Sequence, residues 1–138
     1  MVTEKTFYDK SVRFTNILVE NGREVSKCII EVNKDTWQIS SWYTKEDCLG
    51  QGFGKKCMRE LINHIYSKLG EPSHIEYIWN GQNEYVHEWM QRNFYPISKC
   101  PIAVQKYQAD DDWESHIYML NVNAFLTYFG TKAEKKTA

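Results

Sequence analysis

The chain has 138 residues, of which 42% are hydrophobic and 25% are charged, and its formal net charge is -1. This composition is that of an ordinary globular protein, so we expect residues 1–138 to form a single domain with a flexible tail from about residue 130. A net charge near zero argues against a general electrostatic grip on nucleic acid. No apolar run approaches the roughly 20 residues of a membrane span, and the N-terminus lacks the apolar centre of a signal peptide, which favours a cytoplasmic protein.

The cysteines do not suggest a metal site or a disulfide framework. Cys28, Cys48, Cys57 and Cys100 are scattered, without a CxxC pair or the Cys and His spacing of a zinc site. We therefore expect reduced, partly buried thiols and no bound metal.

The first part of the chain has the pattern of an antiparallel meander. Val12–Glu20 and Arg23–Val32 are rich in β-branched residues, and Asn21-Gly22 between them favours a type I′ hairpin turn. A second turn at Asn33–Asp35 leads into Thr36–Thr44, which reads as a third strand.

A long amphipathic helix is predicted after Gly54. Its apolar residues recur at helical spacing down one side, and Gly70 and Pro72 end it. The apolar positions are Cys57, Met58, Leu61, Ile62, Ile65, Tyr66 and Leu69. His74–Trp79 then has the composition of a buried strand, and because a helix joins it to the preceding strand, we expect the two strands to be parallel.

The remaining elements complete a mixed sheet. We expect a helix over Gln82–Arg92, strands at 95–98, 103–108 and Ser115–Val122, and a short helix or strand over 124–130. The fold class is therefore α+β, a mostly antiparallel sheet with one parallel pair and two main helices.

Three glycines alternate just before the helix, in the stretch LGQGFGKKC. A strand that ends in such a turn and opens a helix directs unpaired N–H groups and the positive end of a helix dipole at one point, which suits an anion such as phosphate. The spacing fits neither a P-loop, since three residues separate Gly50 from Gly54 and Lys55 is followed by Lys56, nor the GxGxxG dinucleotide fingerprint.

This loop resembles that of the GCN5-related N-acetyltransferase family, in which Arg/Gln-x-x-Gly-x-Gly/Ala lies between a strand and a long helix. Leu49-Gly50-Gln51-Gly52-Phe53-Gly54 follows that pattern except at its first position, and the stretch from Asn83 to Tyr95 matches the family's second-helix pattern in part. The resemblance covers about Thr36 to Tyr95. It implies an acetyl-CoA-dependent N-acetyltransferase of reduced size, in which the strands on either side of the first helix separate around the coenzyme.

The resemblance also assigns roles to residues. The loop would hold the pyrophosphate of acetyl-CoA, and the backbone of the preceding strand, with Asn83, would hold its pantetheine arm. The loop residues are Leu49, Gly50, Gln51, Gly52, Phe53, Gly54, Lys55 and Lys56, and the strand residues are Trp42, Tyr43 and Thr44.

Transfer to an amine requires a base, because a protonated amine has no lone pair with which to attack. Glu76, within the strand that faces the expected gap, is our candidate, and Glu46 and Asp47 are alternatives. The family commonly protonates the departing thiolate with a tyrosine where this chain has Met90, which cannot donate a proton. Tyr85 is our candidate acid, Tyr95 could replace it, and the thiolate could also leave through solvent.

The acceptor site should be open. Family members usually have a first strand and two helices ahead of the hairpin, yet only about ten residues precede it here. A second subunit, as in a homodimer, or a large acceptor such as a protein amine would complete the site, and the acidic loop Asp110–Glu114 would favour a cationic amine. The alternatives are an inert binding module with the same fold, acting through protein-protein contacts, and an interaction protein with no coenzyme.

Overall fold

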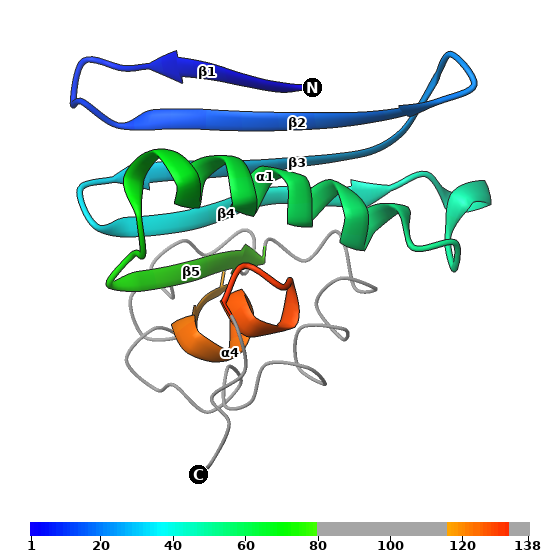
Figure 1. The fold of residues 1–138 in the computed structure, drawn as a ribbon. Coiled ribbons are helices and arrows are strands. Elements are labelled where there is room, and N and C mark those ends of the chain that lie inside the picture. The colour runs from blue at the N-terminus through cyan, green and yellow to red at the C-terminus, as the bar shows by residue number, and fades with distance from the viewer. Residues whose placement is uncertain (80–115, 133–138) are drawn as a thin grey trace, which may run out of the picture.

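The computed structural model describes residues 1–79 and 116–132, which form one sheet with helices against it (Figure 1). The strands are β1 (Val2–Thr6), β2 (Val12–Glu20), β3 (Arg23–Asn33), β4 (Thr36–Thr44), β5 (His74–Trp79) and β6 (His116–Leu120). The helices are the short 3-10 helix η1 (Glu46–Cys48), α1 (Phe53–Leu69) and α4 (Val122–Tyr128).

The six strands lie in chain order across the sheet. Each neighbouring pair is antiparallel except β4 and β5, which are parallel because α1 carries the chain back between them. The predicted α+β class, mostly antiparallel with one parallel pair, is confirmed. The hairpin turn is also as predicted, since Asn21 and Gly22 both have positive φ, at 54° and 74°.

Strand β1 is not predicted by the sequence. Of its five residues only Val2 is partly buried, so VTEKT lacks the alternation that indicates a strand. The strand pairs antiparallel with β2 and forms one edge of the sheet. The residues ahead of the predicted hairpin therefore add a strand to it.

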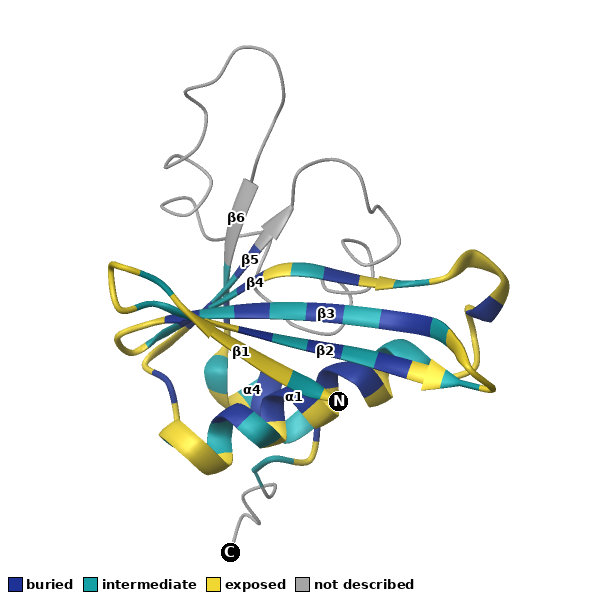
Figure 2. Ribbon diagram, turned by 90° about the horizontal axis from the view of Figure 1, so that it is seen from above, coloured by how far each residue is buried: buried dark blue, intermediate teal, exposed yellow. Residues whose placement is uncertain are grey.

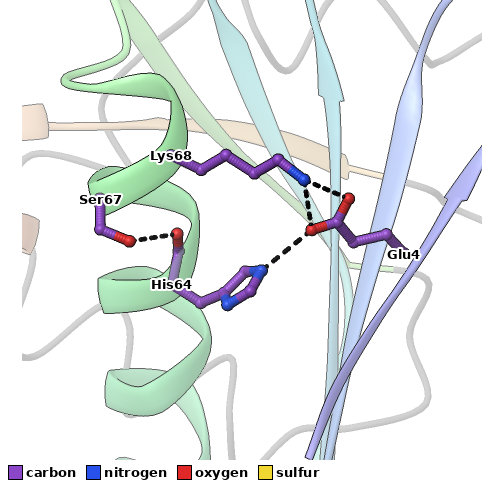
Figure 3. A network of polar contacts seen from close by, with 4 residues as sticks. All are labelled: Glu4, His64, Ser67 and Lys68. Carbon is purple, nitrogen blue, oxygen red and sulfur yellow. Dashed lines mark hydrogen bonds and ion pairs between the residues drawn. The ribbon is translucent and has the colours of Figure 1, made fainter.

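A polar network attaches this edge strand to helix α1 (Figure 3). Lys68 Nζ donates to the Glu4 carboxylate at 2.6 and 2.7 Å, and His64 Nε2 lies 3.0 Å from the same group. These hydrogen bonds hold the pKa of Glu4 below its usual value. The network joins two segments that are far apart in sequence.

The core lies between the sheet and helices α1 and α4, which cover the same face (Figure 2). The predicted apolar side of α1 packs here, with Leu61, Ile62 and Ile65 fully buried. Facing residues of the sheet, such as Ile30 and Ile39, are equally buried. Burial of this shared apolar surface supplies the main driving force for folding.

Residues 124–130, for which the sequence allowed either a short helix or a strand, belong mostly to helix α4. Strand β6 ends at Leu120, two residues before the predicted end, because the side chain of Asn121 accepts a hydrogen bond from the Ala124 amide at 2.9 Å and caps α4. The predictions for residues 80–115, namely the helix at Gln82–Arg92, two strands and the acidic loop, lie outside the described residues, as does the tail 133–138.

The three cysteines in the described ranges are free and buried. Cys28 and Cys57 lie side by side, with 3.3 Å between their sulfur atoms, and burial raises the pKa of the Cys28 thiol. None of the helices in these ranges is both long enough and apolar enough to cross a membrane.

Candidate functional site

Strands β4 and β5 stay together over only half of β4. The parallel pairing joins Thr36–Ile39 to His74–Tyr77 and then stops. At this point β4 has a bulge, since Ile30 pairs with Ile39 and Ile29 with Ser41, which leaves Ser40 as the extra residue. From there β4 pairs only with β3 and β5 only with β6 among the described residues, and Figure 2 shows the two strands diverging. The expected separation is therefore present, and we call the point after Ile39 the fork.

The backbone amides of residues 50–55 are unpaired within the described part of the chain. Gly50 and Gly52 have φ of 79° and 81°, which side chains rarely tolerate, and Gly52 is the N-cap of α1 without a capping side chain. The first helical hydrogen bond runs from the Lys56 amide to the Gly52 carbonyl at 3.0 Å, and the Leu49 amide donates to Glu46. Of the eight predicted loop residues, Leu49 and Lys56 thus donate their amides to carbonyls of the protein. The amides of the other six have no such acceptor among the described residues.

Gly54 is required by close packing and not by its backbone conformation. A Cβ on Gly54 would lie 2.8 Å from Thr44 Oγ1. The Trp42 indole Nε1 donates to the Gly54 carbonyl at 3.0 Å, which attaches the first turn of α1 to β4. The predicted residues of β4 and of the loop are therefore in direct contact.

The charge at this helix end is opposite to what helix stability favours. The first turn of α1 has no acidic residue but contains Lys55 and Lys56, whose charges repel the positive end of the helix dipole. Lys55 Nζ lies 4.3 Å from the centre of the Tyr128 ring, and Lys56 Nζ lies 3.5 Å from Glu20. An uncapped N-terminus with two lysines is locally unfavourable, and such conflicts are common at sites that bind an anion.

The three residues assigned on β4 alternate across the sheet. Trp42 is buried on the helix side, with its ring edge-on to Phe129, and Thr44 Oγ1 lies 3.2 Å from Ser26 Oγ. Tyr43 is partly exposed; burial, followed by its hydrogen bond to Glu24 at 3.0 Å, raises its phenol pKa. Their side chains thus contact other parts of the protein, and the pairing of β4 with β5 ends before all three residues.

Glu76 lies one residue before the fork. It pairs with Gln38 across the parallel strands, and its carboxylate accepts a hydrogen bond from Gln38 Nε2 at 3.3 Å. Its neighbours Ile75 and Tyr77 are buried on the helix side, so Glu76 lies on the opposite face, where it is half-buried.

The alternative bases differ from Glu76 in position. Asp47 contacts Arg23 at 2.6 Å, and this guanidinium lowers the pKa of the Asp47 carboxyl, which weakens it as a proton acceptor. Glu46 is in η1, which follows the C-terminal end of β4, so it lies away from the fork. Asn83 and Tyr85 lie outside the described residues, as do Met90 and Tyr95.

Sequence reasoning missed the bulge and the Trp42 contact. The bulge has a signal in TWQISSWYT, because buried residues occur at Trp37 and Ile39 and then only at Trp42, a step of three instead of two. The contact between Trp42 and Gly54 has no sequence signal, since it depends on how α1 crosses β4.

Comparison with solved structures identifies this arrangement. The PaiA N-acetyltransferase of Thermoplasma acidophilum, solved with coenzyme A, matches 80% of this chain and 59% of its own length, with a TM-score of 0.54 and 12% identity. Nourseothricin acetyltransferase matches 81% of this chain and 65% of its own, with a TM-score of 0.56 and 14% identity. Tetrahymena GCN5 matches 79% of this chain and 69% of its own length, with a TM-score of 0.52 and 9% identity.

The chain has the fold of the GCN5-related N-acetyltransferases. No protein-family model matches the sequence, and the comparison with curated proteins found no match. The chain spans 59% of the length of the PaiA enzyme. Within this N-acetyltransferase fold, β1 runs into β2 through residues 7–11, with no helix between them.

Proposed function

We propose that this chain binds acetyl-CoA and transfers the acetyl group to a primary amine of a small molecule or a protein. Two neighbouring features carry the proposal. One is the set of backbone amides of residues 50–55, which have no hydrogen-bond acceptor within the described ranges, and the other is the β4 backbone beyond the fork. Amides at a helix N-terminus suit phosphate oxygens and a strand backbone suits an extended amide arm, so together they match a ligand that has both.

The pyrophosphate would lie at the N-terminus of α1. Amides there donate to phosphate oxygens, the helix dipole favours negative charge, and Lys55 and Lys56 add two positive charges. Leu49 at the start of the loop would contribute only its exposed side chain. The same binding would compensate the local cost of two lysines at an uncapped helix start.

The pantetheine arm would extend along β4 toward the fork. Trp42, Tyr43 and Thr44 pair with β3 on one side, and on the other side the pairing of β4 with β5 ends at Ile39, before these residues. An extended arm with two amide groups can pair with this edge as a short strand would. Asn83 remains our prediction for a further hydrogen bond to the arm.

The reaction would be direct attack by a neutral amine on the thioester carbonyl. The amine nitrogen forms a bond to the carbonyl carbon, the carbon-sulfur bond breaks, and coenzyme A leaves as the thiolate. Glu76 would accept the proton that the amine loses, either directly or through one water. Tyr85 would give a proton to the departing thiolate. The products are an N-acetyl amide and coenzyme A.

Two measurements test the proposal in sequence. Calorimetric titration with acetyl-CoA should give one site per chain, and absence of both heat and thermal stabilisation would refute coenzyme binding. Thiol release should then be followed over small amines, polyamines and peptides with free α- or lysine amines. Binding without release by any acceptor would instead support an inert module with the same fold.

A further inference from the structure

We propose that Gln38 is a positioning residue for Glu76, so that the acceptor amine meets an oriented carboxylate at the fork. This inference rests on the proposed acetyl transfer and assigns a role to a residue that the proposal does not use. Gln38 and Glu76 are directly paired on β4 and β5, one residue before the two strands separate.

The contact is specific in its donor and acceptor. Gln38 Nε2 lies 3.3 Å from Glu76 Oε2, and both side chains are half-buried on the face of the sheet opposite to α1. An amide donor to one carboxylate oxygen restricts rotation of the group. The second oxygen of Glu76 is then available to take a proton from an amine.

The charges along the same row of the sheet leave Glu76 without a cationic partner in the described ranges. The row runs from β1 to β6 through Lys5, Arg13, Glu31, Gln38, Glu76 and Met119. Arg13 pairs with Glu31 at 2.8 Å and neutralises it, whereas the side-chain hydrogen bond of Glu76 within residues 1–79 and 116–132 comes from the neutral amide of Gln38. A half-buried carboxylate with no counter-ion among the residues that the structure describes suits the approach of an ammonium group that must then lose its proton.

The contact itself can be tested without turnover. In a pH titration followed by NMR, the side-chain amide signals of Gln38 should move as Glu76 takes up a proton, and they should not move in Glu76→Gln. Amide signals that titrate equally in both proteins would contradict the contact. This readout is independent of whether acetyl-CoA binds.

The role in catalysis is tested by Gln38→Met, which keeps the side-chain length and removes the donor. We expect kcat/KM for the best amine of the panel to fall about tenfold and the affinity for acetyl-CoA to stay the same. Glu31→Gln, in the same row but bound to Arg13, should change neither value.

A double-mutant cycle separates positioning from a merely structural role. Gln38→Met should cause no further loss in a Glu76→Gln background, because its effect acts through that carboxylate. An equal loss in both backgrounds, or no loss in the single variant, would overturn the assignment. If the wild-type chain binds coenzyme A but acetylates no acceptor, the proposed function fails instead, and this role fails with it.

Discussion

The indole of Trp42 donates a hydrogen bond to the Gly54 carbonyl at 3.0 Å, which joins the C-terminal half of β4 to the first turn of α1. The two residues belong to the two parts of the proposed coenzyme site. The backbone of Trp42 lies beyond the fork, and the amide of Gly54 is among those that would hold the diphosphate. Displacement of one part should therefore disturb the other.

Replacement of Trp42 by Phe should test this coupling. The variant keeps an aromatic ring against Phe129 but removes the donor, so we expect about 1–2 kcal/mol less stability in urea and a several-fold weaker affinity for acetyl-CoA. Trp37→Phe is the matched control, because Trp37 is also buried and lies before the fork. Stability lost without any loss of affinity in Trp42→Phe would contradict the coupling.

Gly54→Ala should destabilise the protein although alanine favours helices. The added Cβ would lie 2.8 Å from Thr44 Oγ1, and this overlap should outweigh the propensity gain, with a net cost of about 1–3 kcal/mol. Adding Thr44→Ala to Gly54→Ala removes the obstructing oxygen, and this double variant should recover most of the lost stability. Urea denaturation of both variants measures the effect, and a double variant no more stable than Gly54→Ala would show that the contact is not the cause.

Gly52→Asn should weaken coenzyme binding more than it affects folding. Asparagine tolerates positive φ, and a Cβ at Gly52 meets no atom of the protein within 4 Å, so the fold should persist. The side chain would instead enter the space for the diphosphate, and we expect at least a tenfold weaker calorimetric affinity for acetyl-CoA. Gly22→Asn, also at positive φ but in the β2–β3 turn, should leave the affinity unchanged.

The Glu4 network predicts a loss of stability in acid. The hydrogen bonds from Lys68 and then His64 lower the pKa of Glu4 in the folded protein. The stability that Glu4 contributes is therefore present above its pKa in the unfolded chain, near 4.5, and is lost as pH falls through the lower pKa of the folded state. The Tm of the native protein and that of Glu4→Gln should differ at neutral pH, and the difference should shrink as pH falls below 4.5. A constant difference down to pH 2 would mean that the carboxylate does not contribute through its charge.

The sequence predicts the parts of the fold that depend on local signals. The Asn21-Gly22 turn, the apolar side of α1 and the glycine loop all have patterns that a few neighbouring residues determine. Strand β1 has no such pattern, because an exposed edge strand buries too little to require alternation. The hydrogen bond from Gln38 to Glu76 joins residues far apart in sequence, so only the register of β4 and β5 reveals it.

The most direct test of the central claim is an NMR titration of the backbone amides with coenzyme A. If the amides of residues 50–55 bind the diphosphate, their signals should show the largest changes, followed by those of residues 41–44 beside the fork. Pantetheine alone, which has no diphosphate, should change the second group and not the first. Saturable binding with the largest changes elsewhere, or no change in either group, would contradict the account.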